Sequence, residues 1–226
     1  MTITDYQRAR RHLMRVDPRL ATLIKQVGPC GLPDIPQAPP FMALAEAIAS
    51  QQLSTKAADT IFGRFCGLFG PDGVPEPVRL LQFDDETIRG VGFSRAKVMF
   101  LRDLASRVVD RRLDLDTLHE REDLHVLEQL TAVKGIGPWT AEIFLMFRLR
   151  RPDVFPADDL GLVKAAQRLY RMRQRPSKKR LLQMAEAWRP YRSVAAWYLW
   201  RSLSLPDTGR APSMKATNGL RQRRST

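Results

Sequence analysis

A pair of glycines between two apolar segments constrains this chain most, within Leu130-Thr-Ala-Val-Lys-Gly-Ile-Gly-Pro-Trp-Thr-Ala141. Helical apolar spacing ends at Gly135 and Pro138 begins the next segment, which is typical of a tight joint between two helices. Gly135 and Gly137 are expected to adopt backbone conformations that a side chain would resist. The joint would expose amides at the positive end of a helix, where a phosphate can approach closely. The sequence therefore predicts a turn that binds nucleic-acid phosphate without reading bases, although such turns also join ordinary core helices.

The charge of the whole chain favours such a partner. Its 226 residues include 37 Lys and Arg against 24 Asp and Glu, which gives a formal net charge of +13 and a pI near 10.5. A polyanion is a better explanation of this excess than solubility alone, given the glycine turn. No apolar run reaches the roughly 18 residues that a membrane span needs, and the N-terminus has no signal-peptide core. We therefore expect no membrane association and a cytoplasmic location, with nucleoid association if the source is bacterial.

Helical spacing of apolar residues recurs along the chain, and no window alternates as a strand does. Two short helices broken at Asp17-Pro18 are expected within residues 5–28. Further helices are expected over about 41–51, 54–69, 94–110, 121–133, 138–149, 159–170, 177–187 and 191–204. Ser54 and Ser94 stand where N-caps are needed, and Ser94 lies in Gly90-Val-Gly-Phe-Ser-Arg-Ala-Lys97, a weaker copy of the glycine turn. The sequence predicts an all-α protein.

The chain divides into three parts by composition. Residues 1–40 are predicted to be N-terminal helices and a Pro-rich linker that pack on the core, and residues 41–206 the core itself. Residues 207–226 carry five basic residues against one acidic residue. They are predicted to form a basic, disordered tail that adds nonspecific affinity for DNA.

Two adjacent carboxylates open a predicted helix in Val154-Phe-Pro-Ala-Asp-Asp-Leu-Gly-Leu-Val-Lys164. Aspartate is a favoured N-cap, so this pair has a purely structural explanation. Adjacent helical residues diverge by about 100°, however, so one carboxylate can cap the helix while the other points elsewhere. The interpretation adopted from the sequence assigns the cap to Asp158 and a free carboxylate to Asp159.

Taken together, these segments resemble the helix-hairpin-helix (HhH-GPD) DNA glycosylase superfamily, in particular its 3-methyladenine DNA glycosylase II branch. The resemblance rests on Gly-Ile-Gly-Pro-Trp-Thr-Ala, Pro-Ala-Asp-Asp, Ser-Gln-Gln-Leu-Ser-Thr-Lys-Ala-Ala and Trp-Arg-Pro-Tyr-Arg-Ser, in that family's order and spacing. It covers roughly residues 41–205. It implies two helical subdomains with a cleft between them, in a compact form without the strand-rich N-terminal domain of larger members.

The resemblance also implies a reaction and the residues that carry it. Asp159 would be the catalytic carboxylate, and Trp139 stands where lyase-competent members have a lysine. The chain is thus expected to be a monofunctional DNA glycosylase that acts as a monomer on double-stranded DNA, hydrolysing the N-glycosidic bond of alkylated purines such as 3-methyladenine to initiate base excision repair. The base pocket is expected to contain Trp139, Trp200, Ile143 and Leu160, the last two at positions where a relative has tyrosines.

Three further sites follow from the resemblance alone. Gln52 is expected to be the wedge that fills the gap left by a flipped base, with Leu53 as the alternative. The phosphate-binding hairpin is expected to comprise Lys134, Gly135, Ile136, Gly137 and Thr140. No cofactor is expected to be required, although Na⁺ or K⁺ could bind the backbone carbonyls of Thr131, Val133 and Ile136 when DNA is bound; Cys30 and Cys66 are too few for an iron–sulfur cluster.

Two other functions remain open at the level of sequence. One is a glycosylase for a deaminated or mispaired base. The other is a noncatalytic helix-hairpin-helix module that binds DNA structure, which would not need a carboxylate at Asp159.

Overall fold

A computed structural model describes residues 1–206, so the predicted tail over 207–226 lies outside the described residues. Its α-helices are α1 (Ile3–Val16), α2 (Pro18–Val27), α3 (Pro40–Ser50), α4 (Thr55–Gly67), α5 (Pro77–Gln82), α6 (Asp85–Gly90), α7 (Arg95–Val109), α8 (Asp123–Thr131), α9 (Pro138–Phe147), α10 (Leu160–Leu169), α11 (Lys178–Ala185) and α12 (Arg192–Ser202). Short 3₁₀ turns occur at Leu32–Asp34, Leu118–Glu120 and Glu186–Trp188. The described residues form no strand, which confirms the predicted all-α fold. None of the described helices combines the length and apolar composition required to cross a membrane.

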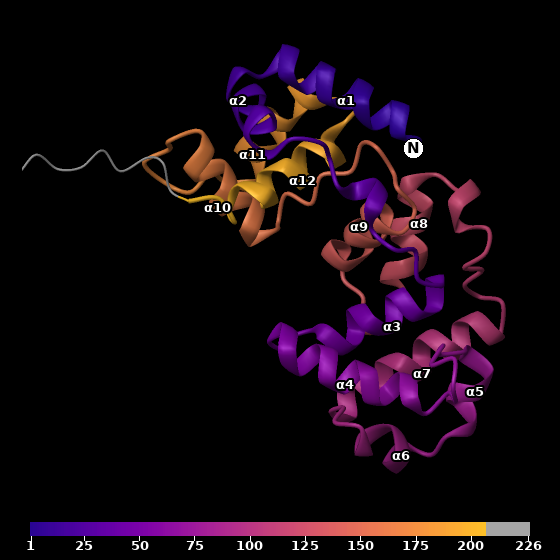
Figure 1. The fold of residues 1–226 in the computed structure, drawn as a ribbon. Coiled ribbons are helices and arrows are strands. Elements are labelled where there is room, and N and C mark those ends of the chain that lie inside the picture. Colours follow the sequence, from indigo (N-terminus) through magenta and orange to yellow (C-terminus); the bar gives the residue numbers. More distant parts are fainter. Residues whose placement is uncertain (207–226) are drawn as a thin grey trace, which may run out of the picture.

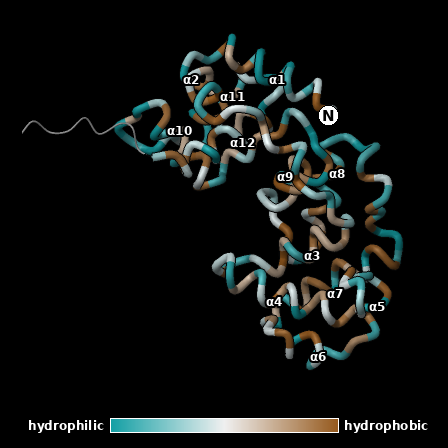
Figure 2. The backbone as a smooth tube through the Cα atoms, viewed as in Figure 1, coloured by the Kyte–Doolittle hydropathy of each residue, from teal (hydrophilic) through white to brown (hydrophobic). Residues whose placement is uncertain are grey.

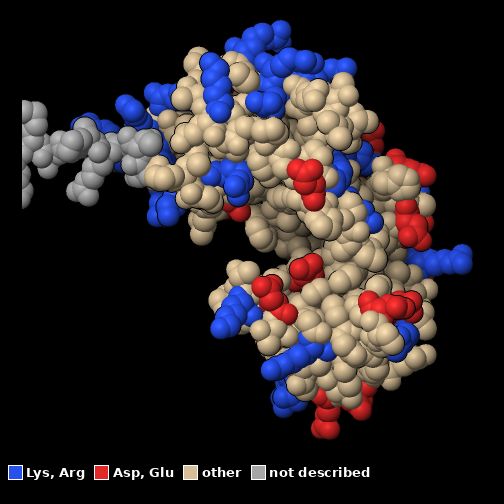
Figure 3. All heavy atoms as spheres, in the orientation of Figure 1, with Lys and Arg blue, Asp and Glu red and all other residues tan. Residues whose placement is uncertain are grey.

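The helices form two lobes with a hollow between them. One lobe consists of α3–α7; the other, the terminal lobe, combines α1 and α2 with α10–α12, so that both ends of the described chain meet there (Figure 1). Helices α8 and α9 lie between the lobes, and α9 packs against α3. The space-filling view shows the hollow open to solvent on one side (Figure 3). This is the predicted arrangement of two helical subdomains around a cleft.

Each lobe is held by its own apolar packing. Hydrophobic residues recur along the helices of both lobes, interrupted by hydrophilic ones (Figure 2). In the α3–α7 lobe the Phe65 ring packs edge-on against Phe69 and Phe93, with centroids 5.1 and 5.3 Å apart. In the terminal lobe Trp188 and Tyr198 are fully buried. Burial of rings of this size is the dominant stabilising contribution to each lobe.

A polar contact joins the N-terminal helices to the rest of the terminal lobe. Asp17 caps α2 by accepting from the amides of Arg19 and Leu20, each at 3.0 Å. Its other oxygen accepts from the Tyr170 hydroxyl at 2.5 Å and from the Trp188 indole at 3.0 Å. Burial, followed by the adjacent Asp17 carboxylate, raises the pKa of Tyr170, so the hydroxyl stays a donor. One side chain therefore both starts α2 and docks it.

The sequence-based helix assignments are accurate for the longer helices and incomplete for the shortest. Every predicted helix lies within two residues of its observed bounds, and the Ser54 and Ser94 hydroxyls cap α4 and α7 as predicted. Helices α5 and α6 were not predicted. Each has six residues, which is too short to show helical periodicity. Their starts are nevertheless encoded, by Pro77 at the first position of α5 and by Asp84 as the cap of α6.

Candidate active site in the cleft

The glycine hairpin connects α8 to α9, and its two glycines are needed for different reasons. Gly135 has φ +83°, and a Cβ there would lie 2.2 Å from the Phe100 ring, so both conformation and space require glycine. Gly137 has φ −92° and ψ 173°, an extended conformation that any residue adopts, and nothing lies within 4 Å of a Cβ there. The expectation of a strained backbone at Gly137 is therefore wrong. Its missing side chain leaves open space outside the protein.

The hairpin is anchored to α7 on its inner side and exposed to solvent at Lys134 and Gly137. Ile136 and Thr140 are buried, and Thr140 lies in the first turn of α9. The Lys134 amide donates to the Asp103 carboxylate at 2.9 Å, whereas the Lys134 side chain is exposed. Helix α9 begins at Pro138, and no described side chain caps it. Its first-turn amides therefore lack partners, as an anion site at a helix N-terminus requires.

The Asp159 carboxylate is held by three N–H donors from three helices. Its Oδ1 accepts from the Leu162 amide at 2.7 Å and from the Trp200 indole at 2.9 Å. Its Oδ2 accepts from the Trp139 indole at 2.9 Å. Asp159 is thus the N-cap of α10, and the assignment of the cap to Asp158 is wrong. Asp158 is exposed instead and pairs with Lys178 at 2.5 Å.

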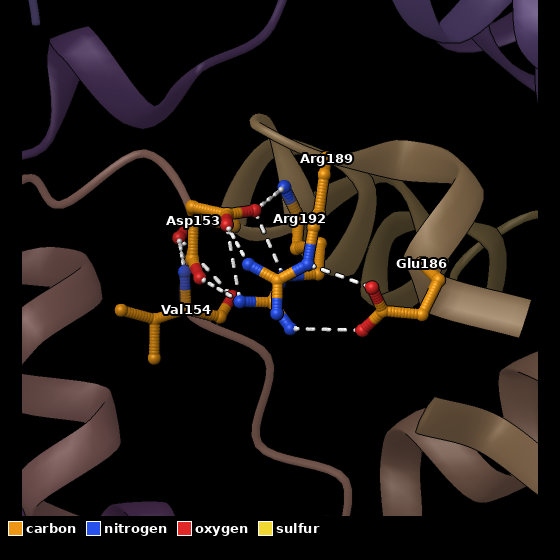
Figure 4. A network of polar contacts seen from close by, with 6 residues as sticks. Asp153, Val154, Glu186, Arg189 and Arg192 are labelled. Carbon is orange, nitrogen blue, oxygen red and sulfur yellow. Dashed lines mark hydrogen bonds and ion pairs between the residues drawn. The ribbon is translucent and has the colours of Figure 1, made fainter. Parts of the chain in front are cut away.

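The segment that leads to Asp159 is held at its start, Asp153 and Val154, by the first residues of α12 and by Arg189 just before it. The Arg192 guanidinium donates to both the carboxylate and the carbonyl of Asp153, and Arg189 donates to the same carboxylate at 2.7 Å (Figure 4). The Ser193 hydroxyl accepts from the Val154 amide at 2.9 Å and donates to the Val154 carbonyl at 3.1 Å. An extended segment has no helical hydrogen bonds of its own, so these contacts fix its path.

The predicted base-pocket residues lie on α9, α10 and α12, the three helices that meet at the carboxylate. Trp139 is 45% exposed and Leu160 is 77% exposed, so both present apolar surface to solvent. Ile143, half-buried, follows Trp139 by one turn on the same face of α9. Trp200 packs on Phe147 with centroids 5.8 Å apart while donating to Asp159. The structure thus brings Trp139 and Trp200 together at Asp159, and Trp200 is at once a packing residue and a neighbour of the carboxylate. A place for Ile143 and Leu160 in a base pocket stays a prediction.

Gly161 is a site residue that sequence reasoning missed. A Cβ there would lie 2.9 Å from Asp159 Oδ1 and 3.2 Å from the Trp200 ring. Glycine is a poor helix former, yet it occupies the first turn of α10. The reason is clearance for the carboxylate and the indole, which a linear pattern does not reveal.

Glu142 is the second missed group. It follows Trp139 by three residues on α9 and is half-buried. Burial raises the pKa of Glu142 to about 7; the Lys178 ammonium opposes this shift and the Asp158 carboxylate adds to it. Near neutral pH this carboxyl group therefore exchanges between its protonated and charged forms.

The predicted wedge residues lie in the turn between α3 and α4, here called the wedge turn (residues 51–53). Gln52 and Leu53 are both exposed, and Gln52 has φ +59°. The Gln51 side chain, in contrast, points inward and donates to the Gly135 carbonyl at 2.8 Å. The wedge turn and the hairpin are therefore in direct contact.

The carbonyls predicted to hold a monovalent cation belong to the turn that leaves α8. Those of Thr131, Val133 and Ile136 are neutral oxygen donors, which suit a hard cation. The Val133 carbonyl already accepts from the Ile136 amide at 3.1 Å, which leaves it one lone pair for a metal. The donor set fits the group, and the cation stays a prediction.

Comparison with known proteins identifies the family. Residues 45–190 match the model of the HhH-GPD superfamily base excision DNA repair proteins. The chain belongs to this superfamily. The resemblance noted in the sequence is thereby confirmed, and the hairpin between α8 and α9 is the helix-hairpin-helix of the family name.

The most similar HhH-GPD relatives include two proteins of Schizosaccharomyces pombe. The chain is 32% identical over 211 residues to the alkylbase DNA glycosidase-like protein mag2, covering 91% of this chain and 98% of mag2. It is 36% identical over 208 residues to DNA-3-methyladenine glycosylase 1, covering 91% of each. Among solved structures, S. pombe 3-methyladenine DNA glycosylase Mag1 bound to abasic DNA superposes with a TM-score of 0.79 at 35% identity, covering 90% of this chain and 100% of Mag1. A DNA-3-methyladenine glycosidase from Bacillus halodurans gives 0.74 at 38% identity, covering 84% and 86%.

The clearance at Gly161 generates the first prediction. Gly161→Ala should lower the rate of base release by about ten- to a hundredfold, because the added Cβ displaces the Asp159 carboxylate from its position beside the substrate. Alanine is the better helix former, which offsets part of the cost of displacing the cap, so the protein should still fold. Single-turnover base release measured beside thermal melting checks this. Full activity in a folded Gly161→Ala protein would show that the carboxylate tolerates displacement.

The open space at Gly137 generates the second. Gly137→Asp should fold normally yet bind damaged and undamaged duplexes about tenfold more weakly, because it places a negative charge against a phosphate. Gly67→Asp, which adds the same charge in open space at the end of α4 away from the wedge turn, is the matched control. Binding titrations on both duplexes test the effect. Parental affinity in Gly137→Asp would mean that the hairpin does not contact the backbone.

Proposed function

We propose that this chain is a monofunctional DNA glycosylase that flips alkylated purines, such as 3-methyladenine, out of double-stranded DNA and hydrolyses their N-glycosidic bond. The observation that carries the proposal is the Asp159 carboxylate, held by two tryptophan indoles inside the cleft. The names of the relatives, which are 3-methyladenine glycosylases, support the substrate class.

The geometry of Asp159 supports catalysis through electrostatic stabilisation. Cleavage of the N-glycosidic bond builds positive charge on the sugar, and a carboxylate beside it stabilises that charge. Three hydrogen bonds fix both oxygens before the substrate arrives, so no reorganisation is needed as the charge develops. Oδ2, with one N–H partner among the described residues, keeps a lone pair that can accept a proton from the attacking water.

The surroundings of the carboxylate suit a leaving group that is already cationic. A purine alkylated at N3 or N7 carries a positive charge and leaves without a strong general acid. The exposed indole of Trp139 provides a surface on which an electron-poor ring stacks favourably. Open apolar surface at Leu160 and Ile143, in place of the tyrosines of a relative, shapes the rest of the pocket without adding hydrogen-bond donors.

The remaining elements grip the DNA. The hairpin amides and Lys134 bind one phosphate regardless of sequence, and Gln52 or Leu53 fills the gap left by the flipped nucleotide. A monovalent cation on the carbonyls of Thr131, Val133 and Ile136 would add positive charge beside that phosphate. All of these contacts are independent of the base that is excised.

Substitution of the carboxylate tests the catalytic proposal. Asp159→Asn should lower base release from alkylated duplex by at least about a hundredfold, the order expected for losing one electrostatic stabiliser. Folding and duplex affinity should persist, because asparagine retains an oxygen that can accept from the Leu162 amide. The measurement is chromatography of the free bases released from alkylated DNA.

The neighbouring aspartate is the matched control. Asp158→Asn removes the same charge one residue earlier, breaks only an exposed pair with Lys178, and should release bases at nearly the parental rate. If neither parent nor Asp158→Asn releases any base while both bind duplex tightly, the chain is a noncatalytic DNA-binding module.

The residue at position 139 tests the monofunctional assignment. Trp139 cannot form a Schiff base with the sugar, so borohydride added during turnover should trap no protein–DNA complex and the product strand should stay intact at the abasic site. Denaturing electrophoresis of the reaction resolves both. An adduct that survives Lys134→Ala would contradict the assignment.

A further inference from the structure

One side of α7 supports both the wedge turn and the phosphate-binding hairpin. Lys97, Phe100 and Asp103 follow one another at intervals of three residues, so their side chains leave similar sides of successive turns. Phe100 fills the space beneath Gly135, and Asp103 accepts from the Lys134 amide. Lys97 reaches in the other direction, to the end of α3. A single rigid helix therefore holds two elements that lie far apart in the sequence.

Lys97 is placed for contact with α3. It stands in the first turn of α7, where the helix dipole disfavours a cation. Its ammonium group donates to the Ala49 carbonyl at 2.6 Å and to the Gln51 carbonyl at 2.8 Å, at the C-terminal end of α3, where a cation is favoured. Partial burial lowers the pKa of Lys97, which reflects how far the group has left solvent for this contact. The residue thus stabilises the start of the wedge turn at the expense of its own helix.

Gln51 completes the connection. Its backbone carbonyl accepts from Lys97 while its side-chain amide donates to the Gly135 carbonyl of the hairpin at 2.8 Å. The next residue, Gln52, has φ +59°, a conformation that costs free energy for any residue other than glycine and persists only when its neighbours impose it. For Gln52 the hydrogen bonds of Lys97 and Gln51 supply this constraint, because they hold the residues just before it.

We propose that Lys97, acting through Gln51, is a positioning residue that fixes the wedge turn relative to the phosphate-binding hairpin. This role rests on the proposed function, because it requires that Gln52 or Leu53 of the wedge turn enters the DNA. A flipped nucleotide stays out of the stack only if the wedge enters at a set distance from the phosphate that the hairpin grips. A wedge turn released from α7 would leave DNA binding intact and lose this registration.

The test uses the full chain and a duplex that contains a tetrahydrofuran abasic analogue opposite 2-aminopurine. Insertion of the wedge into the gap changes the fluorescence of the 2-aminopurine, independently of any base release. In Lys97→Met, the ratio of inserted to uninserted complexes should fall about tenfold, the order expected for losing a charge-assisted hydrogen bond. Affinity for the same duplex should change less than about threefold, because the hairpin contacts remain.

Two variants sharpen the result. Lys25→Met removes the same charge from an exposed position on α2 and should leave both insertion and affinity unchanged. Gln51→Met removes only the hydrogen bond to the Gly135 carbonyl and should reproduce the insertion defect. If thermal melting shows that Lys97→Met is unfolded, the insertion measured for Gln51→Met tests the positioning role instead. The double variant should be no worse than Lys97→Met, because both residues act on one turn.

The outcomes separate this proposal from the proposed function. Folded variants that insert like the parent overturn the positioning role, as does a parent that shows no insertion at all. The same preparations are assayed for base release from alkylated duplex. A parent that inserts its wedge but releases no base overturns the proposed substrate class while the variants still decide the role of Lys97.

Discussion

The hydrogen bonds to Asp159 are the interaction on which the rest of the site depends. They join α9 through Trp139, α10 through the Leu162 amide and α12 through Trp200, and these donors span 61 residues of sequence from Trp139 to Trp200. The cleft wall is therefore not a surface that happens to carry an acid. It is a set of helices, packed through their apolar side chains, that a shared carboxylate bridges, and α12 in turn holds the start of the segment that leads to Asp159.

A carboxylate in a cleft that binds a polyanion has to be neutralised locally. Asp159 solves this with N–H donors and the positive end of α10. Asp103 solves it beneath the hairpin: burial raises its pKa, but hydrogen bonds from the Lys134 amide and the Arg107 guanidinium outweigh burial and hold the pKa below its ordinary value. Both carboxylates accept hydrogen bonds from protein N–H groups, and these donors reduce the repulsion between each carboxylate and a phosphate. Besides the net charge of +13, the hydrogen bonds to Asp103 and Asp159 therefore favour the approach of a polyanion.

The fold was predictable because apolar residues recur at helical spacing in most of its helices, whereas the connections between them were only partly predictable. Local signals such as Ser54 before α4 and Ser94 before α7 identify an N-cap from neighbouring residues alone, and both are confirmed. The assignment of the cap to Asp158 failed on a physical assumption, that one carboxylate cannot both cap a helix and have an oxygen free for the site. A carboxylate has about four lone-pair positions, and the cap uses one of them. Contacts such as Lys97 with Gln51, or Gly161 with Trp200, depend on tertiary distance and leave no trace in a single sequence.

The two glycine turns show how one pattern records different constraints. In the hairpin, a side chain at Gly135 would collide with Phe100 inside the protein, whereas a side chain at Gly137 would extend into open space. In the weaker copy, the positive φ falls on the second glycine, Gly92, at +117°, where a Cβ would meet Ile61 at 3.0 Å. Gly90 belongs to α6 itself. The copy thus has an internal constraint like that of Gly135, and the helix that follows it starts with a serine cap that occupies one of the amides an anion would need. The start of the following helix therefore separates the two turns: α9 has no side-chain cap among the described residues, whereas Ser94 caps α7.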